Sequence, residues 1–393
     1  MKDILAILRT GAICKNVPNV IASGAKQSQI RRTLQVPSGL EAFLRRLTAC
    51  LARQTFAVLL MVAAASCCCA QSPAKNGLTI VVISDINDAY GSVSYSPQVH
   101  TALDYIERSQ PDLVICAGDM VAGQNLKLSE DNLRAMWRGF DELILRRLRR
   151  HNIPFAFTFG NHDGPNNLRY EHERKIAVEF WQKNRPELDY VDSSNFPGFY
   201  SFTFKGLFIG VIDASTSQIN QTQRDWMQKQ LQSEAARAAR LRVVVGHLPL
   251  YAIAKGRDKA GDVLADADAL RALLSAGGVD YYISGHHHAF YIAKRNDVKM
   301  LSAGALGGGP RQYLNSELPP VKTLTTLQLA DSARSFSVLT HNVSNGMQVI
   351  KLSDLPKELH GHNGVSLLCD SDCDSNKPLS TGKFVECECQ ADK

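Results

Sequence analysis

Residues 154–163 read PFAFTFGNHD, a short apolar run followed directly by a glycine and three polar residues. The apolar run predicts a buried β-strand, and the glycine allows the chain to turn sharply where the strand ends. Four more segments share this design, with polar residues directly after a strand candidate. They are Leu78–Ser84 before Asp85 and Asn87, Asp112–Ala117 before Gly118-Asp119, Arg242–Val245 before Gly246-His247, and Val279–Ser284 before Gly285-His286-His287-His288.

The segments between these strands predict helices and further strands. Amphipathic stretches indicate helices near 97–108, 131–151, 170–184, 221–240 and 264–275. A hairpin is predicted at Phe199–Phe204 and Leu207–Ile212, and more strands near 299–302, 323–330, 334–342 and 346–351. Short apolar strands alternating with helices are typical of an α/β fold, in which helices cover a sheet. Because the carboxyl ends of such strands face the ligand crevice, Asp, Asn and His side chains should gather at one edge.

Each polar cluster has an ordinary explanation when it is taken alone. An aspartate after a strand often caps a turn, a single histidine is often a structural group, and the GHHH run could arise by chance. Five such strand ends in succession, with no competing Ser-His-Asp set or glycine-rich phosphate loop, instead indicate one functional site.

Together the five segments resemble the calcineurin-like metallophosphoesterases, a family that includes the purple acid phosphatases. The family pattern is D-x-H, then G-D, G-N-H-D/E, G-H and G-H-x-H, and the likeness extends over about residues 78–330. The resemblance implies an α/β fold, a two-sheet β-sandwich flanked by helices in four layers, with the metal site at the carboxyl ends of the strands. We therefore assign residues 76–357 to a metallophosphoesterase domain.

The resemblance also implies which residues bind metal. One ion would be held by Asp85, Asp119 and His288, and a second by Asp119, Asn161, His247 and His286, with Asp119 bridging them. Mixed nitrogen and oxygen ligands suit two divalent or trivalent transition-metal ions, namely Mn, Fe or Zn. A dinuclear centre of this kind supplies a metal-bound hydroxide for attack on a phosphate ester.

His162 is the candidate catalytic residue, since it follows a predicted ligand and would stabilise or protonate the leaving oxygen. The alternative is a histidine that only hydrogen-bonds behind the ligands. Two positions depart from the family pattern. Asn87 replaces the histidine of D-x-H; its amide oxygen can bind metal, so we keep it in the ligand set, although a water could fill that place. Ala122 stands where purple acid phosphatases have a tyrosine and many other members have an aspartate that orients the catalytic histidine.

The first 70 residues carry a targeting pattern. Phe56–Ala65, FAVLLMVAAA, is an apolar run too short to span a membrane, so residues 51–70 predict a signal peptide rather than a buried helix. Cys67 fits a lipoprotein box and would then carry a lipid anchor, whereas Cys68-Cys69-Ala70 fits ordinary cleavage before Gln71. Residues 1–50 are interpreted as a start-site artefact or an unstructured leader. We expect a bacterial protein that is exported (periplasmic, secreted or lipoprotein-anchored), with no transmembrane span in its mature form.

The end of the chain, residues 358–393, predicts an extended tail with four cysteines, Cys369, Cys373, Cys387 and Cys389. In an exported protein these would form two disulfides, with three pairings open, and the alternative is a zinc site.

The charge distribution restricts the partners. Residues 1–70 hold nine of the 44 Lys and Arg residues but only two of the 38 Asp and Glu residues, so the remainder is close to neutral. We therefore expect a small phosphorylated substrate and no specific nucleic acid, which argues against a nuclease of the same family. Rim candidates are Asn166, Asn167, Tyr251, His287 and the loop Gly307–Arg311, where Arg311 would bind a phosphate or carboxylate or simply lie on the surface.

The predicted function is an exported metal-dependent hydrolase of phosphomonoesters or phosphodiesters. The alternative is a non-catalytic or weakly active protein that keeps the same fold for binding.

Overall fold

The computed structural model describes residues 77–295 and 297–369, all within the unit Lys75–Lys393. The expected leader, signal peptide and Cys67 anchor lie outside these residues, as do three of the four tail cysteines. Within the described ranges, every helix is too short or too polar to cross a bilayer.

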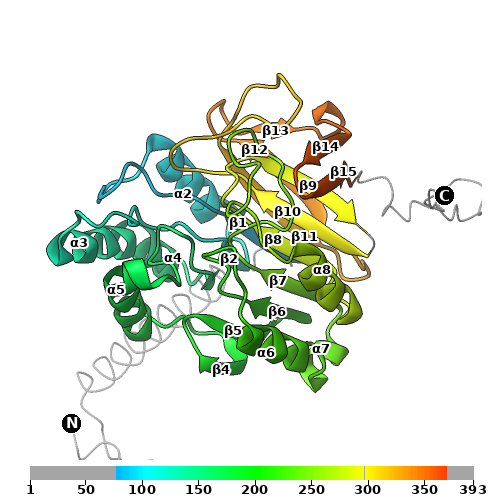
Figure 1. The fold of residues 1–393 in the computed structure, drawn as a ribbon, viewed down its shortest axis with the longest axis horizontal. Helices are drawn as coiled ribbons and strands as arrows, with labels where there is room; N and C mark the ends of the chain where they lie inside the picture. The colour runs from blue at the N-terminus through cyan, green and yellow to red at the C-terminus, as the bar shows by residue number, and fades with distance from the viewer. Residues whose placement is uncertain (1–76, 296, 370–393) are drawn as a thin grey trace, which may run out of the picture. The chain divides into compact units, whose positions relative to one another are not determined.

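Two mixed sheets form the centre of the described unit (Figure 1). The six-stranded sheet has the order β13-β12-β11-β1-β2-β3, and the nine-stranded sheet has the order β14-β15-β9-β10-β8-β7-β6-β5-β4. The strands of the first are β1 (Leu78–Ile83), β2 (Leu113–Cys116), β3 (Phe155–Phe157), β11 (Thr323–Leu329), β12 (Ser337–Asn342) and β13 (Gln348–Ile350). Those of the second are β4 (Asp189–Asn195), β5 (Phe199–Phe204), β6 (Leu207–Val211), β7 (Leu241–Val245), β8 (Tyr281–Ser284), β9 (Phe290–Arg295), β10 (Val298–Ala303), β14 (Glu358–Gly361) and β15 (Gly364–Leu368).

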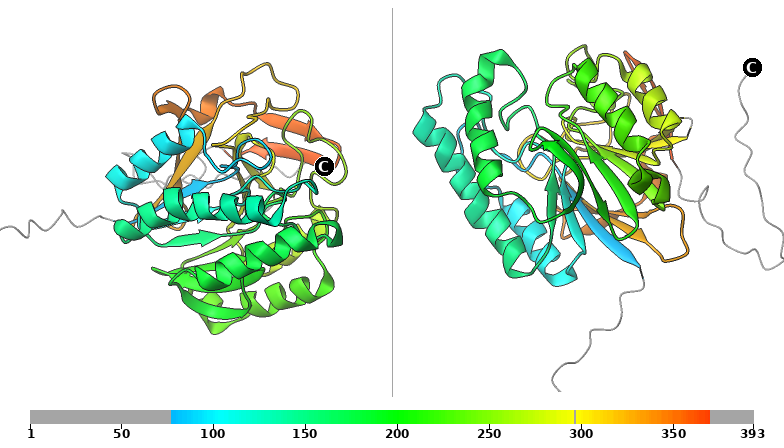
Figure 2. Two further views of the ribbon diagram at one scale, coloured as in Figure 1. Left: turned by 90° about the vertical axis from the view of Figure 1, so that its left-hand side faces the viewer. Right: turned by 90° about the horizontal axis from the view of Figure 1, so that it is seen from below.

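The helices lie on the outer faces of the two sheets (Figure 2). Against the first sheet pack α2 (Pro97–Ser109), α3 (Glu130–Phe140), the π-helical turn Asp141–Leu145, α4 (Arg146–Arg150) and α5 (Glu171–Lys183). Against the second pack α6 (Gln221–Leu231), α7 (Glu234–Ala238) and α8 (Ala267–Ala276). Short 3₁₀ turns at Leu168–Tyr170 and Leu352–Asp354 complete the elements.

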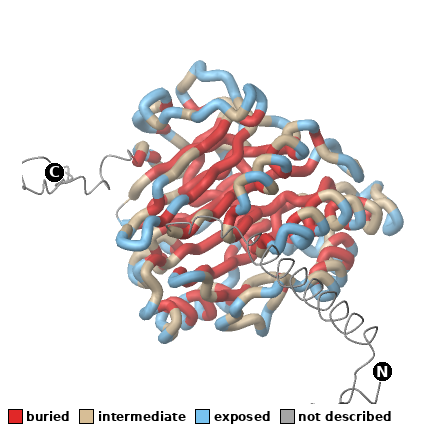
Figure 3. The backbone as a smooth tube through the Cα atoms, turned by 180° about the vertical axis from the view of Figure 1, so that it is seen from behind, coloured by how far each residue is buried: buried red, intermediate tan, exposed pale blue. Residues whose placement is uncertain are grey.

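Alternating side chains of the central strands produce this four-layer arrangement. In β1, Ile80 and Val82 point into the core between the sheets, whereas Val81 and Ile83 point to the helices of the first sheet. Figure 3 shows the resulting band of buried backbone through the strands. The predicted fold class, a two-sheet α/β sandwich flanked by helices, is confirmed.

Parallel strands of both sheets end at one site. β1, β2 and β3 are parallel neighbours in the first sheet, and β7 and β8 are parallel neighbours in the second. The five strand ends singled out in the sequence therefore divide three to two between the sheets. Their loops meet where the two sheets come together, because the backbone amide of His286 after β8 donates to the carboxylate of Asp85 after β1.

The expectation of an extended tail from residue 358 needs correction. β14 and β15 form a hairpin, and β15 extends the second sheet by pairing Leu367 with Lys294 and Leu368 with Ala293 of β9. The hairpin is anchored by Leu359, which is fully buried. Because its neighbours in the sequence are polar, the composition of the segment did not indicate a buried strand. β9 and the polar edge strand β4 were also not predicted, the latter because Asp, Ser and Asn are poor strand formers.

Truncation of Leu359 tests whether the hairpin belongs to the folded domain. Because its side chain is 0% exposed, Leu359→Ala should lower the free energy of unfolding by about 2 to 5 kcal/mol in chemical denaturation. The matched control is Leu367→Ala in the same hairpin, where the side chain is 53% exposed and the expected loss is about 0.5 kcal/mol or less. Equal effects of the two substitutions would show that the hairpin is not docked.

Candidate metal centre

The predicted ligands sit on sharply turned backbone. Four of them have left-handed φ angles, which cost about 1 to 3 kcal/mol each for residues with a Cβ: Asp85 at 48°, Asp119 at 55°, His286 at 63° and His288 at 51°. Each lies in the turn that follows β1, β2 or β8, so the buried strands of the sheets hold the turn in this conformation. Strain of this kind, concentrated on one group of polar side chains, is typical of a functional site.

Two glycines permit the close approach of the loops. A Cβ at Gly160 would collide with the carboxylate and backbone nitrogen of Asp119, and a Cβ at Gly285 would collide with the side chains of Ser84 and Asp85. Because these contacts involve the predicted ligands themselves, any larger residue at either position would displace a carboxylate from the centre.

The four histidines are oriented in the same manner. In each, one ring nitrogen is hydrogen-bonded to an oxygen of the protein, and the other ring nitrogen points toward the centre. This arrangement is typical of metal-binding histidines. The nitrogen–oxygen pairs are His247 Nδ1 with Ala117 O at 2.7 Å, His288 Nδ1 with Gly309 O at 2.8 Å, His162 Nδ1 with Gly123 O at 3.0 Å, and His286 Nε2 with Asp262 Oδ1 at 3.3 Å. A carbonyl or carboxylate oxygen only accepts, so the proton lies on the outer nitrogen.

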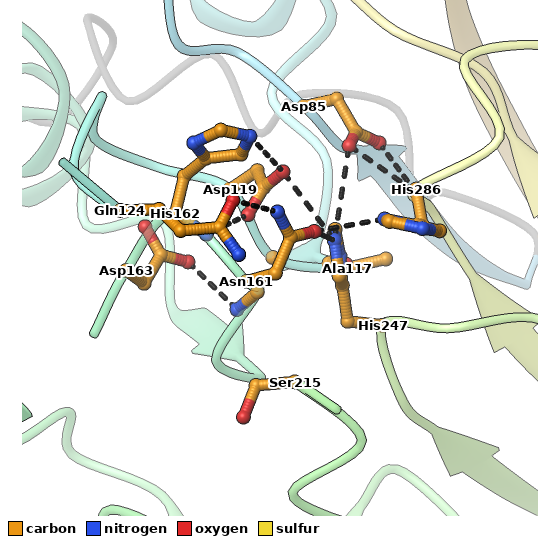
Figure 4. A network of polar contacts seen from close by, with 12 residues as sticks. Asp85, Ala117, Asp119, Gln124, Asn161, His162, Asp163, Ser215, His247 and His286 are labelled. Carbon is orange, nitrogen blue, oxygen red and sulfur yellow. Dashed lines mark hydrogen bonds and ion pairs between the residues drawn. The ribbon is translucent and has the colours of Figure 1, made fainter. Parts of the chain in front are cut away.

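Three potential metal-binding atoms then converge on one point (Figure 4). The Oδ1 atom of Asn161 lies 3.0 Å from His247 Nε2 and 2.8 Å from His286 Nδ1, while its amide group donates to Gln124. His247 Nε2 is also 3.4 Å from Asp119 Oδ2. Ligands around one ion at about 2.1 Å are separated by roughly 3 to 3.5 Å, so this spacing fits a first coordination shell. The inner nitrogen of His286 and Oδ1 of Asn161 both present lone pairs at 2.8 Å, and a cation between them would relieve this contact.

A second group of atoms lies beside the first. His288 Nε2 is 3.2 Å from Asp85 Oδ1, and the same carboxylate oxygen lies 4.0 Å from His247 Nε2. Ligand atoms of Asp85, Asp119 and His247 all fall within 4.8 Å of one another. The structure thus brings six of the seven predicted ligands together as two adjoining clusters that share Asp119.

Asn87 is placed less directly. Its backbone N–H donates to Asp119 O at 3.2 Å and its carbonyl accepts from Gly308 at 3.0 Å, so the residue ties the loop after β1 to two neighbouring loops. Its side chain is nearly buried. These contacts leave metal binding by Asn87 a prediction.

The electrostatics of the centre favour positive charge. Burial raises the pKa of Asp119, but the charges of His247 and His162 outweigh it and hold the pKa below its usual range. Burial lowers the pKa of His247, yet the charge of Asp119 overcomes this and raises it to about 9. The protonated imidazole therefore balances the buried carboxylate where a metal cation would do so. Burial lowers the pKa of His286 to about 4, which keeps this ring neutral and its inner nitrogen available.

His162 lies at the open side of the centre. Its Nε2 is 4.0 Å from Asp119 Oδ2, and its backbone N–H donates to Asp119 Oδ1 at 2.8 Å. The carbonyl of Gly123 replaces the aspartate that is missing at Ala122 as the partner of its Nδ1. Tyr90, 59% exposed, packs its ring 5.2 Å from the imidazole and was not predicted from the sequence.

Asp163 of the GNHD turn holds the loops instead of facing the metals. Its carboxylate accepts from the backbone amides of Met120 at 2.7 Å, Val121 at 3.0 Å and Gly160 at 2.9 Å. Burial and then the charge of Asp119 raise the pKa of Asp163 to about 7. Asp163 thus fixes the Asp119 turn against the turn that carries Asn161 and His162.

Several rim assignments change in the structure. His287 is fully buried and supports the loop after β7 through Ile253 N–H and the Asp262 carbonyl, and Tyr251 is buried with its hydroxyl on Asp268. Neither lines the rim as expected. Asp262, by contrast, was missed although it holds His286; its only signal was the Gly261-Asp262 pair, which follows no apolar strand.

With this geometry in view, comparisons with known proteins identify the family. The model of the calcineurin-like phosphoesterase family matches residues 78–290, more than half of the 393-residue chain. The chain belongs to the calcineurin-like phosphoesterase family. The prediction of a metallophosphoesterase is therefore confirmed at the level of the family.

Relatives within the family are purple acid phosphatases. The chain is 26% identical to purple acid phosphatase 18 of Arabidopsis thaliana over 57% of this chain and 46% of that protein. It is 29% identical to the tartrate-resistant acid phosphatase type 5 of Rattus norvegicus over 42% of this chain and 52% of that protein. The chain thus spans about half the length of these relatives. The solved purple acid phosphatase PPD1 from yellow lupin shares the fold, with a TM-score of 0.54, 15% identity and coverage of 70% of this chain and 52% of that one.

Removal of the carboxylate behind His286 should weaken metal binding. Asp262→Ala deletes the acceptor for Nε2, so the ring loses its fixed tautomer, and metal affinity should fall about 10- to 100-fold. Calorimetric titration of metal-free protein with Mn²⁺ measures the change. Asp258→Ala is the matched control, since Asp258 lies in the same loop but pairs with His362 instead. Unchanged affinity in the Asp262 variant would remove His286 from the ligand set.

Proposed function

We propose that this protein is an exported hydrolase of phosphate esters that works with a dinuclear transition-metal centre of Mn, Fe or Zn. The observation that carries the proposal is the convergence of six side chains from five strand ends, in two clusters that share the carboxylate of Asp119. Membership of the calcineurin-like phosphoesterase family supports the reaction class, and the purple acid phosphatase relatives support a phosphatase.

The donor set fits two adjoining ions. Asp85 and His288 would hold one ion, Asn161, His247 and His286 the other, and Asp119 would contribute to both, because its carboxylate lies between the two clusters. When bound, such a pair acidifies water to supply a nucleophile and neutralises charge on the phosphoryl oxygens. Imidazole and amide donors beside the carboxylates suit Mn, Fe or Zn better than Mg or Ca.

We propose that His162 acts on the leaving group. Its Nδ1–H donates to the Gly123 carbonyl, which leaves Nε2 at the open side of the centre. In the protonated ring, Nε2 can give a proton to the departing oxygen, and Asp119 Oδ2, 4.0 Å away, stabilises that charge. The side chain is only 15% exposed, and its hydrogen bond to the Gly123 carbonyl fixes the orientation of the ring.

Hydrolysis by the full chain tests the proposal. With Mn²⁺ added, the protein should hydrolyse nitrophenyl phosphate or its bis ester, and His162→Ala should lower kcat about 10²- to 10⁴-fold while metal content is retained. Asp119→Asn should lower both metal content and activity, because it removes the charge that the two clusters share.

His172→Ala is the matched control, since this histidine is exposed on α5, where it pairs with Glu130 on the surface. A metal-loaded wild-type protein that is inert toward both substrates would favour the alternative, a member of the family that binds without catalysis.

We also propose that residues 51–70 direct export, with Cys67 as the residue that would be acylated. In bacteria that express the full chain, labelled palmitate should enter the protein, and Cys67→Ser should abolish the label. Cys68→Ser is the neighbouring control. A mature N-terminus at Gln71 without label would replace the lipid anchor by ordinary cleavage, and full-length protein in the cytoplasm would contradict export.

A further inference from the structure

Two arginines lie directly behind the histidines of the metal centre. Arg257, in the loop between β7 and α8, places Nη1 2.7 Å from the same oxygen of Asp262 that faces His286 Nε2. Arg311 follows β10, and its backbone N–H donates to the carbonyl of His288 at 3.1 Å. Arg257 thus contacts the carboxylate that supports the ring of His286, and the backbone of Arg311 contacts the backbone of His288.

The two side chains approach each other. Nη1 of Arg311 would lie 3.0 Å from a Cβ on Gly256, the residue before Arg257, so the guanidinium reaches the Arg257 loop. Burial, and after it the charge of Arg257, lowers the pKa of Arg311, while Asp262 and Asp85 partly offset this. The guanidinium of Arg311 therefore lies in a partly dehydrated place close to the loop of a second arginine.

This cluster contains unused hydrogen-bonding groups. Nε of Arg257, Nε of Arg311 and Oδ2 of Asp262 are buried without a hydrogen-bond partner. Within residues 77–295 and 297–369, the guanidinium of Arg311 makes neither an ion pair nor a hydrogen bond, and it is only partly exposed. A partly buried charge without a partner destabilises the protein. The planar N–H donors of a guanidinium match the geometry of a carboxylate or phosphate, so an anion would supply that partner. A structural arginine would instead be paired, as Arg147 is with Asp104 and Glu107.

We propose that Arg257 and Arg311 form a subsite for a second anionic group, so that the preferred substrates carry a phosphate ester and a further phosphate or carboxylate. The inference rests on the proposed function, since it names the substrate class of the same site. Asp262 contacts the nitrogen of His286 that is turned away from the centre, so an imidazole ring separates Arg257 from the metals. Arg257 is therefore set back from the position that a reacting phosphoryl group would take.

The leaving group has its own partner elsewhere in the site. Figure 4 places His162 and His286 on opposite sides of Asn161. In a phosphodiester that spans the centre, the leaving oxygen would face His162, and the other ester substituent would carry the second anion to Arg311. Substrates with a single short phosphate would leave the arginines without a ligand.

Binding of non-hydrolysable analogues tests the subsite without any turnover. The Mn²⁺-loaded full chain is titrated calorimetrically with phenylphosphonate and with phenylphosphonates that carry a carboxylate at the meta or para position. The wild type should bind at least one carboxylated analogue more tightly than phenylphosphonate. Arg311→Gln should weaken that analogue about tenfold or more relative to phenylphosphonate, since a charge-assisted hydrogen bond is lost. Arg311→Lys should recover part of the lost affinity, because lysine keeps the positive charge but not the planar arrangement of N–H donors.

Lys259→Gln is the matched control, since it removes one positive charge from the Arg257 loop at a 73% exposed side chain. Equal weakening of all analogues by Arg311→Gln would place the arginine on the reacting phosphoryl group and overturn the proposal. No weakening, or the same selective loss in Lys259→Gln, would also overturn it. Absence of hydrolysis in a separate assay would bear on the proposed function alone, because the titration requires none.

Discussion

The buried negative charge of Asp85 and Asp119 constrains the whole centre. Both carboxylates are almost completely shielded from water, at 0% and 1% exposure, and an uncompensated buried carboxylate costs several kcal/mol. The compensation comes from both sheets, since Asp85 accepts from the backbone of His286 and Asp119 faces His247. These contacts therefore hold the two sheets together at the edge where a metal pair would bind. The site and the packing of the sandwich depend on the same contacts.

The strained turns around these carboxylates depend on the core below them. β1, β2, β7 and β8 end in residues that are fully or almost fully buried, and their alternating side chains fill the space between and outside the sheets. A left-handed aspartate or histidine directly after such a strand cannot relax without pulling the strand out of register. The rigidity of the ligand positions is thus a property of the sheets, and the glycines at 160 and 285 only make room for it.

The sequence predicted the ligand cluster because each member follows an apolar strand, usually beside a glycine. The strands near 78–84 and 242–245 were recognised from their β-branched residues, and their ends are where Asp85 and His247 lie. Asp262 escaped prediction because it lies in the middle of a loop, and its role depends on the approach of His286 from a different strand. β14 and β15 escaped because their anchor, Leu359, is surrounded by polar residues that predict a tail. These contacts join segments that are distant in the sequence, so no local sequence pattern predicts them.

The replacement of a side-chain carboxylate by a backbone carbonyl beside His162 has a physical consequence. The carbonyl of Gly123 orients the ring as a carboxylate would, because it also accepts from Nδ1–H. It carries no net charge, however, so it stabilises a protonated imidazole less than an aspartate would. That stabilisation must come from Asp119, whose Oδ2 lies on the other side of the ring from Gly123 at 4.0 Å from Nε2. The departure at Ala122 would therefore make the proposed proton transfer by His162 depend on Asp119, the carboxylate that the two clusters share.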